Sequence, residues 1–207
     1  MKYTSVGFDL DGTLWNSLGT IIDGWTTASR EFGLKVPTYD ELRSVMGFNR
    51  RQLMDKLYPG ISPEIEEPFL ERCNSLCDSL IAERGAVLYD GLEETLALLS
   101  SSVSLYIASN CQEGYIERFL DRYSLGKYFC DYRFSGQKCI SKGENIRELI
   151  KSNGFESSVF VGDTQGDRDA ARDAGVEFIY AAYGFGCVDS YNYKIESFRE
   201  LKELILG

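Results

Sequence analysis

The chain has 207 residues, of which 43% are hydrophobic and 26% are charged, as in a globular protein with one substantial core and room for a small second unit. Its 22 basic and 32 acidic residues give a net charge of −10, which disfavours nucleic-acid and anionic-membrane partners. The sequence contains no histidine, which excludes Ser-His-Asp and Cys-His catalysis and histidine-based zinc sites. In an enzyme of this composition, carboxylates, lysine, hydroxyl groups or a metal ion must carry charge and protons.

The cysteine spacing and the absence of a leader-like segment bear on the cellular compartment in which the protein is expected. Cys73 and Cys77 lie four residues apart, which suits one face of a helix better than a redox or metal motif. The chain shows no basic-then-apolar leader and no apolar stretch near the roughly 20 residues that span a bilayer. We therefore expect a cytoplasmic protein with reduced thiols. The six cysteines are Cys73, Cys77, Cys111, Cys130, Cys139 and Cys187.

The first predicted element is a strand, Ser5–Leu10, rich in apolar residues. The segment that follows, from Asn16 to about Arg84, has no convincing strand but several stretches with helical periodicity. This segment is too long for a simple crossover between strands, so we interpret it as an inserted helical unit. Its predicted helices are Ile21–Phe32, Leu42–Met46, Arg51–Leu57 and Phe69–Ile81.

Strands and helices alternate in the rest of the chain. This alternation predicts an α/β fold with a doubly wound parallel sheet, covered by helices on both faces. We therefore expect an α/β core from residues 1–15 and 86–207, and a small helical domain from residues 16–85. The predicted strands are Val103–Ser109, Tyr132–Ser135, Ser158–Gly162 and Val176–Ala181, and the predicted helices are Leu92–Leu99, Tyr115–Leu120, Glu144–Ile150 and Phe198–Leu206.

The first strand leads into the segment FDLDGTL, residues 8–14. Asp9 and Asp11 are two residues apart, so both carboxylates point to the same side of an extended backbone. Gly12 then permits a tight turn. Ligands of open α/β sheets bind beyond the carboxyl ends of the strands, where these aspartates are expected. The alternative interpretation is a solvated acidic turn or the cap of the next helix.

A second acidic cluster follows a later strand, with Asp163 at the strand end and Asp167 four residues on. Either residue could also serve as a helix cap. Ser109 and Asn110 close another predicted strand, and Lys142 precedes a helix. In a parallel sheet these turns share one edge, so the side chains can converge. Four carboxylates in one cleft repel by roughly 4 kcal/mol per close pair, a conflict that bound Mg²⁺ would remove.

In this order the motifs resemble those of the haloacid dehalogenase superfamily, and within it the phosphoglycolate-phosphatase-like members. FDLDGTL resembles the first motif, Ser109-Asn110 the second, Lys142 the third and GDTQGD the fourth. The segments SNCQEGYIERFL and VGDTQGDRDAARDAGV are similar as well. The helical type-one cap of the family is an insertion at the position of residues 16–85. The resemblance thus spans the chain and implies a Rossmann-like core with a small α-helical cap.

The resemblance implies a catalytic role for five residues. Asp9 would be the nucleophile that forms an aspartyl-phosphate. Asp11 would protonate the leaving oxygen and then activate the hydrolytic water. Ser109 and Asn110 would hydrogen-bond the phosphoryl oxygens, and Lys142 would neutralise their charge.

The resemblance also implies a magnesium site. Its ligands would be Asp9, the backbone carbonyl of Asp11 and Asp163, with Asp167 holding the site or a metal-bound water. By the same resemblance, dehalogenases lack the second aspartate of the first motif, and phosphate-transferring ATPases carry threonine there. Asp11 therefore favours hydrolysis of a phosphomonoester.

Substrate contacts are expected from two segments besides Asn110. Gly12 and Thr13 belong to the first motif, and Arg50 or Arg51 lies in MGFNRRQ, which resembles the substrate-facing cap loop of the family. Either arginine could bind a substrate carboxylate or a second phosphate. The alternative interpretation of each is a solvated arginine in a loop at the start of a helix.

The leading function is therefore a magnesium-dependent phosphatase for a small phosphorylated metabolite, acting as a monomer or homodimer. Two departures weaken assignment to phosphoglycolate itself: Trp15-Asn16 replaces an apolar residue followed by Asp, and SKGENI replaces a KPxP-type run. One alternative is a sugar-phosphate mutase of the same superfamily. A second is a signalling module phosphorylated on Asp, but such modules have about 120 residues in one domain and carry the acceptor on a middle strand.

Overall fold

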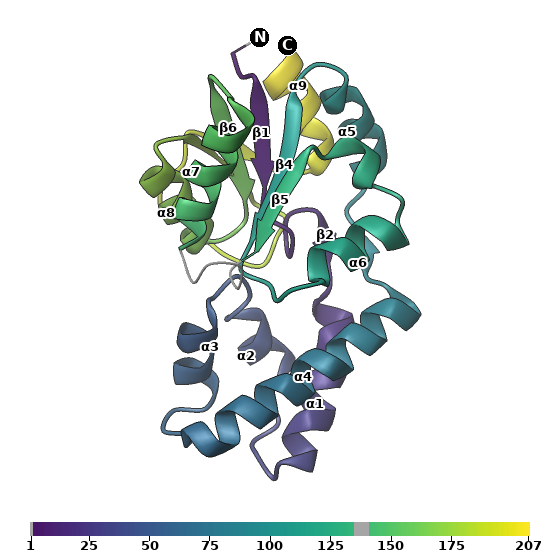
Figure 1. The fold of residues 1–207 in the computed structure, drawn as a ribbon, viewed down its shortest axis with the longest axis vertical. Coiled ribbons are helices and arrows are strands. Elements are labelled where there is room, and N and C mark those ends of the chain that lie inside the picture. The colour runs from purple at the N-terminus through teal and green to yellow at the C-terminus, as the bar shows by residue number, and fades with distance from the viewer. Residues whose placement is uncertain (1, 135–140) are drawn as a thin grey trace.

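The core is a six-stranded sheet in the order β5-β4-β1-β6-β7-β8, with every strand pair parallel. The computed structural model describes residues 2–134 and 141–207. Helices cover both faces of the sheet (Figure 1), as the alternating strands and helices of the sequence predict. The strands are β1 (Ser5–Phe8), β4 (Ser104–Ser109), β5 (Asp131–Phe134), β6 (Ser158–Gly162), β7 (Glu177–Ala181) and β8 (Tyr193–Ile195).

Two apolar layers hold the helices to the sheet. In β6, Val159 and Val161 face one layer and Phe160 faces the other, because successive side chains of a strand point to opposite faces. Both layers are apolar, so the strands read as nearly continuous hydrophobic runs. The first layer is covered by α5 (Leu92–Ser100), α6 (Tyr115–Arg122) and α9 (Leu201–Leu206), and the second by α7 (Lys142–Asn153) and α8 (Gln165–Ala174).

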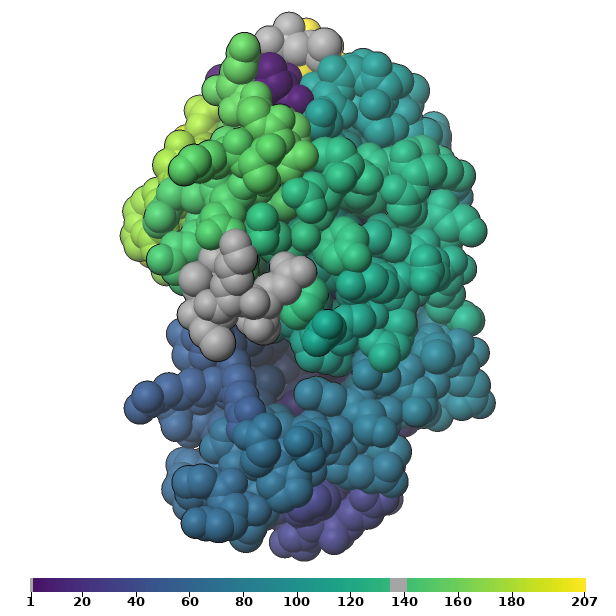
Figure 2. Space-filling view, viewed as in Figure 1, coloured from purple at the N-terminus to yellow at the C-terminus, as the bar shows by residue number. Residues whose placement is uncertain are grey.

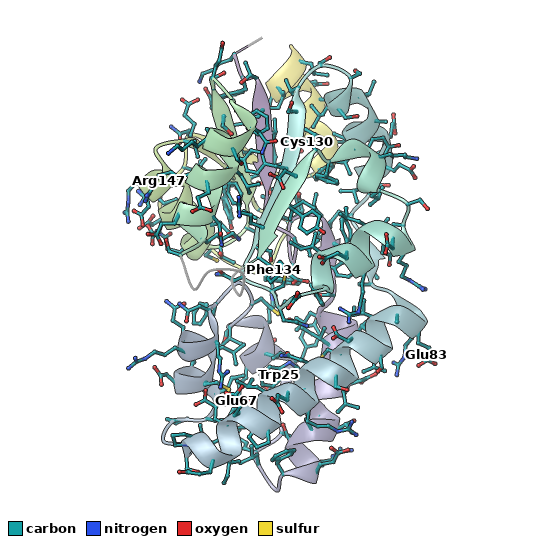
Figure 3. The ribbon with its side chains drawn as sticks, viewed as in Figure 1. Trp25, Glu67, Glu83, Cys130, Phe134 and Arg147 are labelled. Carbon is teal, nitrogen blue, oxygen red and sulfur yellow. The ribbon has the colours of Figure 1, made fainter. Side chains whose placement is uncertain are left out.

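The segment after β1 forms a helical unit with an apolar core of its own. Trp25 lies at its centre, with its ring 6.5 Å from that of Tyr58 and 5.8 Å from that of Phe69 (Figure 3). We call this unit the cap. Its division from the core at residues 16–85 stays a prediction, which the separate apolar cluster supports. The cap helices are α1 (Leu18–Glu31), α2 (Tyr39–Arg43), α3 (Arg50–Leu57) and α4 (Pro63–Arg84).

The cap lies against one end of the core (Figure 2). Two short antiparallel strands, β2 (Trp15–Asn16) and β3 (Val87–Leu88), connect the two parts. On α4, Asp78 accepts a hydrogen bond from Gln112 and lies 3.1 Å from the guanidinium of Arg118 on α6. These contacts hold the cap over the carboxyl end of the sheet.

The sequence predicted the five longest strands, but not β2, β3 or β8, which have two or three residues each. The first strand ends at Phe8 rather than Leu10, because the chain turns there and the carbonyl of Leu10 accepts a bond from the N–H of Leu14 at 2.9 Å. The predicted helix Phe198–Leu206 begins as a 3₁₀ turn.

Among the described residues, five cysteines are free thiols. Cys73 and Cys77 lie on α4, buried in the cap core, as their spacing predicts. Cys139 and the predicted strand residue Ser135 lie outside the described residues. In the described part of the chain, no helix has both the length and the apolar character to cross a membrane.

Gly24 and Gly19, both on α1, form a matched pair for testing the cap core. A Cβ atom at Gly24 would lie 2.8 Å from Sγ of Cys77, whereas one at Gly19 would meet nothing within 4 Å. We expect Gly24→Ala to lower the free energy of unfolding by about 1–2 kcal/mol through overpacking. Gly19→Ala should raise it by up to about 1 kcal/mol through helix propensity. Urea unfolding measures both, and equal effects would contradict the packing at Gly24.

Candidate active site

Asp9 follows β1, at the point of the sheet where the strand order reverses. The chain passes from β1 to β4 on one side and returns to β6 on the other, and such a switch point leaves a crevice beyond the carboxyl ends of the strands. The backbone N–H of Asp9 donates to the carbonyl of Val161 at 2.9 Å. Its side chain is therefore held at the floor of the crevice, where it is 2% exposed.

Three buried carboxylates converge there. Asp9, Asp163 and Asp167 each present an oxygen, and the three oxygens lie within 4.8 Å of one another. At such distances each like-charge pair repels by roughly 4 kcal/mol at an effective dielectric near 20. The ammonium of Lys142, itself 6% exposed, lies 2.5 Å from Oδ1 of Asp9 and 2.5 Å from Oδ1 of Asp167. Among the described residues, the Lys142 ammonium thus pairs with two of the three carboxylates, and no ion pair to Asp163 is found.

Oδ2 of Asp9 is buried without a hydrogen-bond partner among the described residues. An unpartnered buried carboxylate oxygen is costly unless a cation or donor meets it. The neighbouring oxygens of Asp163 and Asp167 are carboxylate oxygens, the ligand atoms that hard cations such as Mg²⁺ prefer. The chemistry of the cluster therefore fits a divalent cation bound by Asp9, Asp163 and Asp167.

Asp163 is held by contacts from two segments of the chain. Its Oδ2 accepts the N–H of Phe185 at 2.6 Å, and its Oδ1 accepts the hydroxyl of Thr13 at 3.4 Å. Gly12, with φ of +90°, lies so close that a Cβ atom would come within 2.2 Å of Oδ2 of Asp163. A left-handed conformation and this close approach both require glycine.

Asp167 is placed by the first turn of α8. Its Oδ2 accepts the backbone N–H of Thr164 at 3.0 Å and the hydroxyl of Thr164 at 2.7 Å. In return its own N–H donates to that hydroxyl at 3.3 Å, which completes a capping box. This capping box uses Oδ2 of Asp167 and leaves Oδ1 for Lys142.

The charges of the cluster displace its pKa values. Burial raises the pKa of Asp9, and Lys142 offsets only part of that effect. Burial, Asp167 and Asp9 together raise the pKa of Asp163. Burial lowers the pKa of Lys142, but Asp167 and Asp9 overcome this effect and leave it raised, so the ammonium stays charged. Excess negative charge is thus the dominant property of the site.

Asp11 is half-buried beside the cluster, and its carboxylate is held separately. Oδ1 accepts hydrogen bonds from Nε1 of Trp15 at 2.9 Å, from Oη of Tyr115 at 3.2 Å and from the hydroxyl of Ser17. Burial raises the pKa of Asp11, and these three bonds lower it. The side chain therefore lies apart from the three carboxylates that could bind a metal.

Ser109 and Asn110 lie at the carboxyl end of β4, as predicted. The oxygen of Ser109 accepts the N–H of Cys111 at 3.4 Å, which leaves the hydroxyl proton as a donor. Nδ2 of Asn110 donates to the carbonyl of Gly47 in the cap at 2.8 Å. A Cβ at Gly47 would lie 3.1 Å from the methyl of Thr164, so this cap loop covers the site.

The other predicted substrate contacts have partners within the protein. The backbone N–H of Gly12 donates to the carbonyl of Trp15, and the hydroxyl of Thr13 donates to Asp163. Arg50 pairs with two glutamates of α4, at 3.1 Å and 2.6 Å, of which Glu67 is labelled in Figure 3. Arg51 pairs with Asp55 and is 91% exposed. No ion pair between either arginine and the carboxylate cluster of Asp9, Asp163 and Asp167 is found among the described residues. The substrate role of the two arginines stays a prediction.

Several supporting residues were not found from the sequence. Thr164 had a local signal, because a threonine three residues before an acidic residue at a helix start is a capping box. The other contacts join residues far apart in the chain and have no such signal. They are the N–H of Phe185 on Asp163, the hydroxyl of Tyr115 on Asp11, and Arg43 of α2, whose Nη2 lies 3.4 Å from the carbonyl of Gly184.

Comparisons with known proteins agree with this geometry. The family model described as haloacid dehalogenase-like hydrolase matches residues 6–181. Phosphoglycolate phosphatases of Pseudomonas savastanoi and Synechococcus elongatus are each 29% identical, over 87% and 86% of this chain and 70% and 83% of their own. A solved structure described as a predicted phosphatase from Clostridium acetobutylicum has a TM-score of 0.87 and 24% identity, covering 100% of this chain and 99% of its own.

The crowded carboxylates give a stability prediction with a defined pH dependence. Because the pKa of Asp163 is raised on folding, its ionisation destabilises the fold, and the cost grows as pH rises above the unfolded value near 3.9. With EDTA at pH 7.5, Asp163→Asn should raise the free energy of unfolding, because the carboxamide leaves no charge to bury beside Asp9 and Asp167.

Urea unfolding between pH 4 and pH 7.5 tests this expectation, and the difference should shrink toward pH 4. Asp169→Asn is the matched control, since Asp169 is an ion-paired carboxylate on α8 with 41% exposure. Its effect should stay within about 1 kcal/mol. A difference that grows toward low pH would contradict the assigned direction of the shift.

Proposed function

Since the chain belongs to the haloacid dehalogenase-like hydrolase family, we propose that it is a magnesium-dependent phosphatase acting through an aspartyl-phosphate on Asp9. Family membership and the phosphatase class were predicted from the motifs, and both are confirmed. The observation that carries the finer proposal is Lys142, which lies 2.5 Å from both Asp9 and Asp167 in a buried carboxylate cluster.

In the first step a carboxylate oxygen of Asp9 attacks the phosphorus of the substrate. The P–O bond to the leaving group breaks, its electron pair goes to the leaving oxygen, and Asp11 supplies the proton. Lys142 and the hydroxyl of Ser109 compensate the charge on the phosphoryl oxygens. The crevice thus supplies positioning and charge, which phosphoryl transfer chiefly needs.

The second step regenerates the enzyme. Asp11, now a carboxylate, takes a proton from water, and the hydroxide oxygen attacks the phosphorus. The bond between phosphorus and the Asp9 oxygen breaks, its electron pair returns to Asp9, and inorganic phosphate leaves. One aspartate carries the proton in both directions, so the chain needs no histidine.

Mg²⁺ would be held by Asp9, Asp163, Asp167 and the backbone carbonyl of Asp11, and when bound it supplies charge neutralisation for the carboxylates and the phosphoryl group. Support comes from the unpartnered Oδ2 of Asp9 and from the three carboxylate oxygens within 4.8 Å of one another.

The proposed substrate is a small phosphomonoester resembling phosphoglycolate. The two similar proteins named as phosphoglycolate phosphatases support this class. The cap loop at Gly47 lies beside Thr164, and its carbonyl accepts a hydrogen bond from Asn110. This loop covers the site, which favours a small substrate. We further propose that the enzyme works in the cytoplasm, which the free thiols Cys73 and Cys77 in the cap core support.

Hydrolysis of p-nitrophenyl phosphate tests the mechanism. We expect turnover with MgCl₂, none with EDTA, and recovery when Mg²⁺ is restored. Asp9→Asn should lower kcat by at least ~10³-fold, because it removes the nucleophile. Asp169→Asn on α8 is the matched control and should retain kcat within about twofold, as expected for an exposed ion pair.

Turnover without metal, or full activity of Asp9→Asn, would contradict the proposal. A panel of phosphoglycolate, pyrophosphate, nucleoside monophosphates and sugar phosphates, ranked by kcat/KM, identifies the substrate class. Release of inorganic phosphate supports the phosphatase, whereas conversion of a sugar phosphate into its isomer without phosphate release would support the mutase.

A further inference from the structure

Asp11 is held through one of its two carboxylate oxygens. Oδ1 accepts three hydrogen bonds, from Nε1 of Trp15 at 2.9 Å, Oη of Tyr115 at 3.2 Å and the hydroxyl of Ser17. Within residues 2–134 and 141–207, no hydrogen bond to Oδ2 is found. The two oxygens of this carboxyl group therefore have different surroundings.

The donors come from a packed aromatic cluster. Trp15 is fully buried, and its ring lies 5.5 Å from Tyr115, 5.0 Å from Phe119 and 6.1 Å from Tyr123. Tyr115 is 3% exposed at the start of α6. Packing on all sides leaves each ring one rotamer, so the core sets the direction of the indole N–H and the position of the phenol oxygen.

The indole distinguishes the two oxygens chemically. The hydroxyl groups of Ser17 and Tyr115 can each donate or accept, so they tolerate a proton on Oδ1 by turning. The indole N–H of Trp15 can only donate. A proton on Oδ1 that pointed at Nε1 would face the indole N–H across the 2.9 Å between the two atoms, and the two hydrogens would repel. A proton on Oδ2 meets no such conflict.

We propose that Trp15 and Tyr115 are positioning residues that orient Asp11 and make Oδ2 the oxygen that carries its proton. This inference rests on the proposed role of Asp11 as the acid of the first step. In that step the proton moves from Oδ2 to the leaving oxygen as the P–O bond breaks, and Oδ1 keeps its three donors. Trp15-Asn16 stands where the family resemblance expects an apolar residue followed by Asp.

A comparison of two leaving groups tests the proposal. The alkoxide released from glycerol 2-phosphate needs a proton as it leaves, whereas p-nitrophenolate leaves without one. The value of kcat/KM reports events up to phosphorylation of Asp9, before Asp11 acts on water. Tyr115→Phe and Trp15→Phe should each lower kcat/KM about tenfold for glycerol 2-phosphate, part of the 10²–10⁴-fold that acid catalysis contributes. For p-nitrophenyl phosphate the loss should stay within about twofold.

Tyr106→Phe is the matched control. Tyr106 is a fully buried tyrosine of β4 in the opposite apolar layer, and its hydroxyl lies 2.9 Å from Oγ of Ser158. It has no contact with Asp11, so the ratio of the two kcat/KM values should not change. Where Trp15→Phe fails to fold, benzothienylalanine at position 15 keeps the ring shape and replaces the N–H with sulfur.

Asp11→Asn separates this proposal from the function on which it rests. If Asp11→Asn affects both substrates equally, Asp11 is not the acid and the proposed function fails. If Asp11→Asn selectively loses glycerol 2-phosphate, but folded Tyr115→Phe and position-15 variants lose both substrates equally or neither, the positioning role is overturned. Selective loss in all three supports it.

Discussion

The ammonium of Lys142, placed between Asp9 and Asp167, is the interaction on which the rest of the site depends. Removing three carboxylates from water is expensive, and a buried charge is tolerated only with partners of good geometry. One lysine cannot neutralise all three, so the fold retains excess negative charge at Oδ2 of Asp9 and at Asp163. This excess of negative charge is what the proposed Mg²⁺ would neutralise.

Helix starts place the charged residues of the site. Lys142 is the first residue of α7 and lies within the capping box formed by Ser141 and Glu144. Asp167 forms the capping box of α8 with Thr164. A capping box fixes the backbone of the first turn because side chain and backbone bond each other reciprocally. Local sequence rules therefore set where each side chain begins, and the parallel sheet brings the two helix starts together. Asp167 is consequently both part of a capping box and an ion-pair partner of Lys142.

Sequence alone predicted the parts that depend on local patterns. The buried strands are continuous apolar runs, and the cap helices have apolar faces, so their ends were predicted to within about three residues. The exception is α4, which begins at Pro63 rather than at the predicted Phe69. The acidic motifs lie at strand ends, and their convergence follows from parallel topology. The strands β2, β3 and β8 were missed because a two- or three-residue strand has no periodicity to detect. The partners of Arg50 were missed because Glu66 and Glu67 reach it only through the packing of α4 beside α3.

Trp15 contacts both the connection between cap and core and the carboxylate of Asp11. It belongs to β2, where it pairs with Leu88 of β3 in the connection between cap and core, and its indole N–H holds Asp11. The hydroxyl of Tyr123, which packs on Trp15, also bonds the backbone of Ala86 at the same connection. A cap movement that shifted β2 against β3 would therefore shift the donor on the acid. Because a packed aromatic cluster leaves little room for its side chains to shift independently, the connection between cap and core and the orientation of Asp11 depend on the same side chains.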